Sequence, residues 1–121
     1  MTTLRLRILF DGAMIGPGKA ELLSRIRDTG SIAAAGRQMD MSYKRAWMLV
    51  EEMNRAFANP LVISTRGGPG GGGAMVTETG TRVLTLYHAV ISTAQTAAAA
   101  ELSALEALLR PSGEMDISDG K

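Results

Sequence analysis

A run of glycine between two short β-branched segments is the feature that most restricts how this chain can fold. Six of the seven residues from 67 to 73 are glycine. The segment LVIST (61–65) precedes this run and AMV (74–76) follows it. Such a tip has almost no side chain to pack and a high entropic cost of ordering. We therefore expect a β-hairpin whose tip is mobile when free.

Three helical patterns precede this hairpin. Pro17 suits the first position of a helix that ends at Thr29-Gly30. Ser31 is expected to cap a short helix, IAAAGRQM, and Ser42 a third helix that ends at Asn59-Pro60. The third helix has an apolar stripe at 3.6-residue spacing, namely Ala46, Leu49, Val50, Met53 and Phe57. Asp40 lies in the turn between the last two helices, where a left-handed backbone is often needed. This spacing is typical of a helix-turn-helix.

Two further elements flank this unit. At the N-terminus, LRLRILF (4–10) alternates apolar and polar residues, which predicts a half-buried strand that stops at Asp11-Gly12. Thr77 is expected to cap a fourth helix running from about 78 to 109. Helices longer than about 25 residues in a small domain usually pair with another helix, so a homodimer seam is expected along it. The expected interface residues are Leu84, Tyr87, Ile91, Ala94, Ala98, Leu102 and Leu105.

The order of these elements predicts the fold class. It is mainly α with a small β component: a winged helix-turn-helix with an N-terminal strand and a long C-terminal dimerisation helix. Residues 1–110 are expected to form this single domain, because 121 residues leave no room for a second domain of ordinary size. Pro111 ends the last helix, and residues 111–121 read as a polar, disordered tail.

Composition excludes several function classes. The chain has no Cys and a single His, His88, which removes disulfides, thiolate zinc sites and most imidazole metal sites. Glu51 and Glu52 are adjacent and point in different directions, so they do not form an acid and base pair. Residues 68–73 match G-x-G-x-x-G, but a strand-like segment follows where a dinucleotide site needs a helix. We expect neither an enzyme nor a bound cofactor.

The sequence also lacks a recognisable membrane or export signal. Residues 4–10 contain two arginines and no long apolar core, and no run reaches about 18 apolar residues. We therefore expect a cytoplasmic chain with no membrane partner.

Charge is unevenly distributed along the chain. Residues 1–76 contain ten Lys or Arg and six Asp or Glu, a net charge of +4, whereas the remainder has a net charge of −3. This distribution suits a footprint on double-stranded DNA within the first two thirds, with ordinary scatter as the alternative. Within the third helix, the apolar stripe turns Lys44 and Met48 outward. Lys44 and Arg45 are the best candidates to contact base edges or phosphates, because two cations in a first helical turn oppose the helix dipole.

The two aromatic residues of the third helix have a second reading. Tyr43 and Trp47 are four residues apart and could pack on a thymine methyl or a sugar. For Trp47, packing at the edge of the core is the favoured alternative. Arg66 and the amides of the glycine run could meet phosphates.

Several segments together resemble the N-terminal DNA-binding domain of the ModE family, the molybdate-responsive transcriptional regulators. They are Gly30-Ser31-Ile32, MSYKRAW (41–47), Glu52-Met53-Asn54, the run from Gly67 to Ala74, and Thr77 with Gly80. The likeness covers roughly residues 3–110, and a looser one to LysR-type winged helix-turn-helix domains covers the same region. Gly36 departs from an ideal second helix, at a cost of up to about 1 kcal/mol relative to Ala.

The resemblance implies a dimeric domain that binds DNA through the third helix and the wing. The expected DNA-contact residues are Ser42, Tyr43, Lys44, Arg45, Trp47, Met48, Arg66, Gly67, Gly68 and Gly70. Full-length family members also carry C-terminal molybdate-binding modules, whereas this sequence continues into an acidic tail, so no bound molybdate is expected within it. The alternative function is a protein interaction module that pairs with a full-length regulator through the fourth helix and modulates it.

Overall fold

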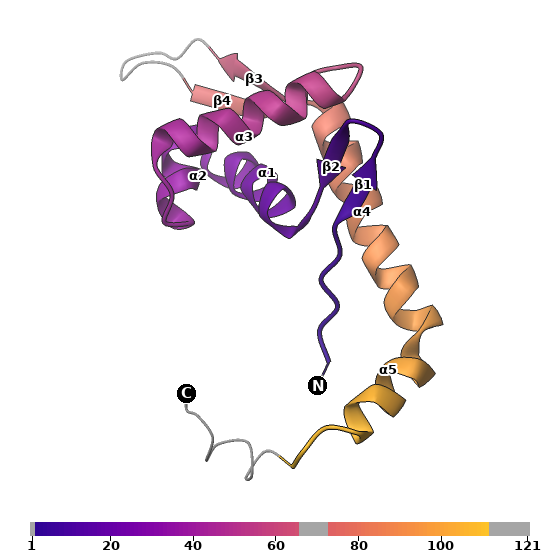
Figure 1. The fold of residues 1–121 in the computed structure, drawn as a ribbon. Coiled ribbons are helices and arrows are strands. Elements are labelled where there is room, and N and C mark those ends of the chain that lie inside the picture. Colours follow the sequence, from indigo (N-terminus) through magenta and orange to yellow (C-terminus); the bar gives the residue numbers. More distant parts are fainter. Residues whose placement is uncertain (1, 66–72, 112–121) are drawn as a thin grey trace.

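The computed structural model describes residues 2–65 and 73–111, and it is mainly helical, as the sequence predicts, with two small antiparallel hairpins, of which the sequence predicts only the second (Figure 1). Within these ranges the elements are β1 (Ile8–Phe10), β2 (Ala13–Ile15), α1 (Pro17–Thr29), α2 (Ile32–Gln38), α3 (Tyr43–Ala56), β3 (Val62–Thr65), β4 (Gly73–Val76), α4 (Glu78–Ala97) and α5 (Ala99–Ala107). This arrangement is consistent with a winged helix-turn-helix.

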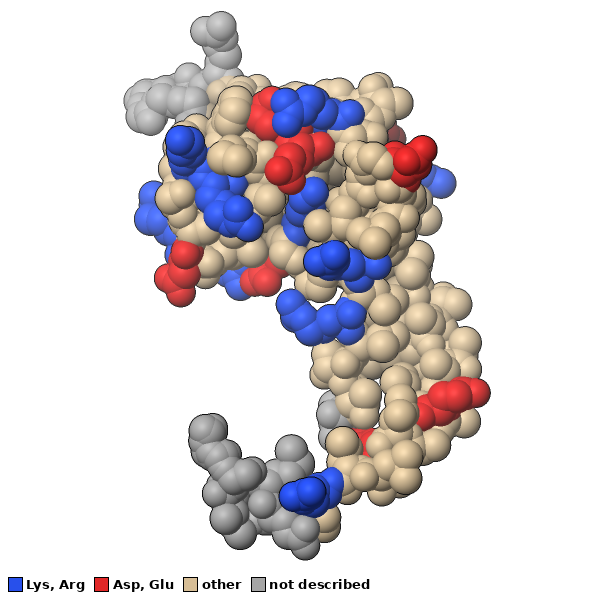
Figure 2. Space-filling view, viewed as in Figure 1, with Lys and Arg blue, Asp and Glu red and all other residues tan. Residues whose placement is uncertain are grey.

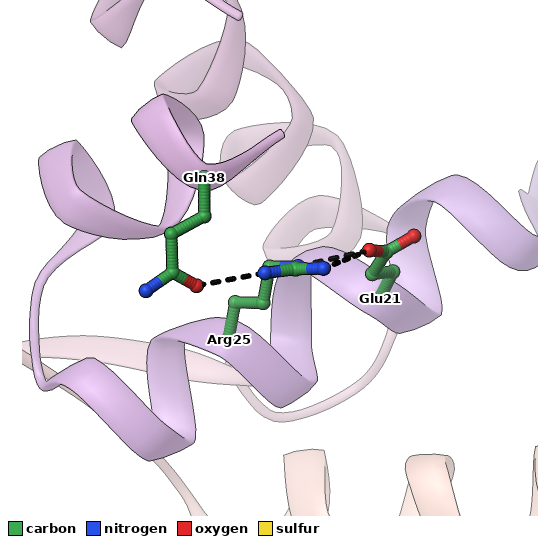
Figure 3. A network of polar contacts seen from close by, with 3 residues as sticks. All are labelled: Glu21, Arg25 and Gln38. Atoms are coloured by element: carbon green, nitrogen blue, oxygen red, sulfur yellow. Dashed lines mark hydrogen bonds and ion pairs between the residues drawn. The ribbon is translucent and has the colours of Figure 1, made fainter. Parts of the chain in front are cut away.

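The core lies where α1, α2 and α3 meet the base of the second hairpin. Leu22, Leu23 and Ile26 on α1 are fully buried and pack in one cluster with Met53 of α3 and Leu61 before β3. A polar contact adds to this packing at the surface (Figure 3). The guanidinium of Arg25 donates to Glu21 Oε2 on its own helix and, from Nη1, to Gln38 Oε1 at 2.9 Å. Arg25 thereby connects α1 to the C-terminal end of α2.

The N-terminal strand is shorter than the sequence predicts, and its partner was missed. Only Ile8–Phe10 forms a paired strand, and it pairs with Ala13–Ile15 across the Asp11-Gly12 turn, with Ile8 opposite Ile15. Residues 2–7 keep the predicted alternation of half-buried and exposed side chains, but they belong to no strand. Tyr87 on α4 holds this segment by donating from its hydroxyl to the Leu6 carbonyl at 2.6 Å.

The prediction of one continuous helix from 78 to 109 is wrong. The helix breaks at Ala98, where the backbone has φ −101° and ψ 13°, and α5 continues at an angle to α4 (Figure 1). Helices in proteins are held mainly by tertiary packing of one face. No residue of α5 is buried, so nothing in the described chain holds α5 in line with α4.

Two predicted segments lie outside the described residues. They are the glycine-rich tip at 66–72 and residues 112–121 of the predicted tail. Among the helices of residues 2–65 and 73–111, none combines the length and apolar character needed to cross a bilayer.

Candidate nucleic-acid interface

The turn between α2 and α3 has the geometry predicted from its sequence. Ser31 caps α2 by accepting from the Ala34 N–H, and Ser42 caps α3 by accepting from the Arg45 N–H at 3.1 Å. Asp40 adopts the predicted left-handed conformation, with φ 58°. These contacts fix the direction in which α3 leaves the turn.

Gly36 lets the two helices of this motif approach each other closely. The Gly36 carbonyl accepts from the N–H groups of Met39 and Met41, which closes the end of α2. A Cβ atom built on Gly36 would lie 3.1 Å from the Ala46 Cβ on α3, a contact tighter than most proteins show. The absence of a side chain at Gly36 therefore serves the packing of α2 against α3.

One side of α3 is buried and the other is exposed. Ala46, Val50 and Met53 face the core, as the apolar stripe predicts. The side chains of Ser42, Lys44 and Arg45 are exposed around the start of the helix, and Met48 is 47% exposed one turn later. The packing of the helix thus leaves its N-terminal end open to a partner.

The two cations at the start of α3 are unpaired. Neither the Lys44 nor the Arg45 side chain forms an ion pair or hydrogen bond with any part of the chain that the structure describes. No acidic residue occupies the first turn of α3, so the helix dipole and these two charges repel. An anion bound at this end would relieve that repulsion. On the face shown in Figure 2, Lys and Arg gather over the helical body, whereas the arm formed by α4 and α5 carries few charges.

Tyr43 and Trp47 form an exposed aromatic edge beside these cations. Tyr43 is 58% exposed and Trp47 is 44% exposed, so more than half of the Trp47 surface is covered. Both line an open groove of about 330 Å³ between α3 and the second hairpin. Its remaining lining residues are Ser31, Ile32, Ala33, Ser64, Thr65, Gly73 and Ala74.

The described part of the second hairpin, β3 with β4, is fixed firmly to the helical body. It pairs in the register Val62 opposite Val76 through Thr65 opposite Gly73. Asn54 of α3 holds the start of β3, because its side chain bonds to both peptide groups around Val62. At the other strand, the Ala74 N–H donates to the Gly30 carbonyl at 3.0 Å.

Thr77 completes the attachment of the hairpin. Its hydroxyl accepts from the Gly80 N–H and so caps α4, as predicted, while the same hydroxyl donates to the Pro60 carbonyl at 2.7 Å. The position of the hairpin relative to α3 is therefore set by hydrogen bonds at both strands.

The predicted DNA-contact residues divide into two groups. Ser42, Tyr43, Lys44, Arg45, Trp47 and Met48 lie together at the exposed end of α3. Arg66, Gly67, Gly68 and Gly70 lie outside the described residues. Sequence reasoning missed Asn54 and the groove, because both depend on contacts between segments that only the folded chain brings together.

The predicted interface residues also divide. Leu84 and Tyr87 are buried within this chain, at 3% and 4% exposure, where they pack in its own core. Ile91, Ala94, Ala98 and Leu102 are half-buried. Leu105 is 62% exposed, and Leu108 and Leu109, which follow it at the end of the arm, are exposed as well. The apolar surface available to a partner thus lies on the outer side of α4 and on α5.

Burial has a chemical consequence for Tyr87. Loss of solvent raises the pKa of its hydroxyl above the usual value of 10.0, and the nearby charge of Arg5 lowers it in part. The neutral hydroxyl that donates to Leu6 is therefore favoured in the folded chain.

No group of His, Asp and Glu side chains among the described residues could hold a metal ion. What the described residues offer to a partner is an exposed helix end, a groove lined by two aromatic side chains and an anchored hairpin.

Comparison with curated proteins identifies relatives of this chain, although no protein-family model matches it. It is 43% identical over 79 residues to the molybdenum-pterin-binding protein MopB of Rhodobacter capsulatus, and the matched segment covers 65% of this chain and 29% of MopB. It is 41% identical over 71 residues to the DNA-binding transcriptional dual regulator ModE of Escherichia coli strain K12, 59% of this chain and 27% of that regulator. It is 38% identical over 81 residues to the transcriptional regulator ModE of Yersinia pestis, 67% of this chain and 31% of that regulator.

These relatives confirm the resemblance read from the sequence. The chain is homologous to the N-terminal region of ModE regulators and spans less than a third of the length of the relatives it matches. The relatives are named as regulators and molybdenum-pterin-binding proteins rather than as enzymes.

Proposed function

We propose that this chain is a DNA-binding transcriptional regulator that acts as a homodimer. The observation that carries this proposal is the end of α3, where Lys44 and Arg45 are exposed, unpaired within the described chain and set against the helix dipole. A phosphate or a guanine edge would give each cation a hydrogen-bond acceptor and would offset its repulsion by the helix dipole. The major groove of DNA is wide enough to admit a helix. The homology to the N-terminal region of ModE regulators supports the same reading.

The proposed arrangement follows from the fold. In a helix-turn-helix, the N-terminal residues of the second helix contact base edges. That helix is α3 here, so Lys44, Arg45 and Met48 would face the bases. The base of the hairpin lies alongside α3, and the sequence places Arg66 and the glycine amides next to it. These groups would contact the DNA backbone.

Dimerisation would supply the second half of the DNA site. The exposed leucines of α5 and the outer side of α4 offer an apolar surface for a second copy. Two copies joined there would present two α3 helices about 34 to 36 Å apart, one turn of DNA.

A second candidate function rests on the same apolar surface. If α4 and α5 pair with a full-length regulator instead of a second copy, the chain modulates that regulator and needs no DNA site of its own. The exposed leucines favour this reading as much as they favour a homodimer, whereas the unpaired cations of α3 favour DNA binding alone.

Selection of bound fragments from random-sequence DNA tests the proposal. DNA binding predicts a recurrent site with two related halves, and binding that weakens steeply with salt. If no sequence is enriched over input and duplex DNA does not bind at low salt, the interaction-module reading replaces it.

A further inference from the structure

The groove beside α3 has a different chemistry from the cationic end of the same helix. Among the residues that the structure describes, those that line the groove are all uncharged. Its apolar lining includes Tyr43, Trp47 and Ile32, and its lining also includes Ser64 and Thr65, two successive residues of β3 that each carry a hydroxyl group. Side chains alternate between the two faces of a strand, so one of these two hydroxyls is the candidate to face the groove. Lys44 and Arg45 lie between Tyr43 and Trp47 in the sequence, but neither of these cations lines the groove.

A stretch of DNA backbone matches this mixture of groups. A deoxyribose ring offers an apolar face that packs on an aromatic ring, and the adjoining phosphate offers oxygens that accept from hydroxyls. A thymine methyl would use the aromatic rings alone and would make no hydrogen bond to a hydroxyl of β3. The nearby cations favour a polyanion over an apolar peptide.

We infer that this groove seats one sugar and its neighbouring phosphate from a single DNA strand, held by uncharged contacts. The sugar packs on Trp47 and Tyr43, and the phosphate accepts from the hydroxyl of Ser64 or Thr65. This inference rests on the proposed DNA-binding function. It assigns to Trp47 a contact with DNA in addition to its packing on the domain.

Uncharged contacts have a measurable signature. A cation that neutralises a phosphate releases counterions, so its loss lowers the slope of log affinity against log salt by about 0.9. A hydroxyl or an aromatic ring neutralises no charge. Removing one should weaken binding by the same factor at every salt concentration and leave the slope unchanged.

The experiment titrates the parent chain and its variants with a labelled duplex taken from the random-sequence selection. Affinity is measured at several salt concentrations. Thr65→Val keeps the shape of the side chain and removes its hydroxyl, and Ser64→Ala does the same at an exposed position. For Trp47→Ala, circular dichroism first establishes that the variant is folded. Met75→Ala is the matched control, because Met75 is 48% exposed on the same hairpin but does not line the groove.

We expect Trp47→Ala, and at least one of the two hydroxyl variants, to weaken binding roughly two- to tenfold at every salt concentration. Met75→Ala should bind like the parent. Groove variants that bind like a DNA-binding parent would overturn the inference and leave the proposed function intact. A parent that binds no DNA would overturn the proposed function itself.

A duplex with deoxyuridine in place of every thymidine lacks the thymine methyl groups and keeps the sugars. It therefore distinguishes a deoxyribose ring from a thymine methyl as the group that packs on Trp47. If a sugar occupies the groove, Trp47→Ala weakens binding to both duplexes by the same factor. If the effect of Trp47→Ala disappears on the deoxyuridine duplex, Trp47 contacts a thymine methyl and the inference is overturned. If a groove variant shows a slope of log affinity against log salt that is shallower by about 0.9, the contact that it lost was a charged one, and the inference is overturned.

Discussion

The side chain of Asn54 on α3 is hydrogen-bonded to both the backbone N–H and the backbone carbonyl of Val62, the first residue of β3. The Asn54 Nδ2 donates to the Val62 carbonyl at 2.9 Å, and its Oδ1 accepts from the Val62 N–H at 3.1 Å. The same Oδ1 also accepts from the Leu61 N–H at 2.8 Å. One side chain thus takes the place of a neighbouring strand at the first residue of the hairpin.

Replacing Asn54 by Ala should destabilise the fold. The substitution leaves partly buried N–H and carbonyl groups without a partner, so the free energy of unfolding should fall by about 1 to 3 kcal/mol. Urea denaturation followed by circular dichroism measures this. Arg55→Ala, at the next and exposed position, is the control and should stay within about 0.5 kcal/mol of the parent. Parent-like stability of Asn54→Ala would mean that other contacts position β3.

Adding a methyl group at Gly80 should also destabilise the fold. A Cβ atom there would contact the Leu61 carbonyl and would lie 2.6 Å from the Val76 Cγ1, so the start of α4 would have to move away from the hairpin. Overpacking of this kind costs about 1 to 3 kcal/mol. Thermal denaturation of Gly80→Ala should show a lower midpoint. Gly18→Ala is the matched control, because nothing lies within 4 Å of a Cβ at that position. Equal midpoints for the two variants would contradict the contact.

Lys44→Ala and Arg45→Ala should change DNA binding without harming the fold. Removing a cation from the first turn of α3 leaves the free energy of unfolding unchanged or slightly higher. Because both side chains are proposed to face the bases, each variant should bind the selected site about 1 to 3 kcal/mol more weakly and random-sequence DNA almost as well as the parent. Arg27→Ala on α1 makes the same change in net charge at an exposed site on another helix. If Arg27→Ala weakens binding to the selected site equally, overall charge rather than the end of α3 governs binding.

Tyr87 should make stability depend on alkaline pH. Its pKa is raised in the folded chain, so the unfolded chain loses this proton first. The stabilising contribution of Tyr87 is therefore fully present below about pH 10 and is lost as pH rises through the raised pKa. The difference in unfolding free energy between the parent and Tyr87→Phe should shrink across that range. A difference that stays constant from neutral to strongly alkaline pH would refute the raised pKa.

Leu105→Glu should prevent assembly if two copies meet through α5. A carboxylate placed in an apolar seam loses its hydration, which costs several kcal/mol and exceeds what a small interface supplies. Light scattering at micromolar concentration should show a dimer for the parent and a monomer for the variant. Leu9→Glu tests an equally exposed leucine, 68% against 62%, on the N-terminal hairpin. A parent that is already a monomer would remove the homodimer from the proposal.

Local signals made the helix-turn-helix predictable from sequence. Ser31, Ser42 and Thr77 cap the three helices that they were expected to cap, because the bond of a cap residue reaches only three residues along the chain. Asp40 was predictable for the same reason, since few residue types accept a left-handed backbone.

Features that depend on tertiary contacts were not predictable in this way. The partner strand Ala13–Ile15 has three residues, too few to show an alternating pattern. Asn54 gives no local signal, because its partners lie on the far side of the turn that follows α3. The break at Ala98 contains neither glycine nor proline, and an unbroken apolar stripe runs through it. Within the candidate site, the apolar stripe was enough to predict which side of α3 is exposed. The groove was not predictable, because it depends on where the hairpin lies relative to α3.

The break at Ala98 gives the arm of this molecule an elbow. In a dimer joined through α5, the distance between the two α3 helices would depend on the angle between α4 and α5, and that angle is set at Ala98. A small change of angle at the elbow becomes a displacement of several ångströms at the far end, comparable to the ~3.4 Å rise of one base pair. In such a dimer, the backbone angles of Ala98 would help to set the number of base pairs between the two halves of a DNA site, although Ala98 lies outside the proposed DNA-contact residues.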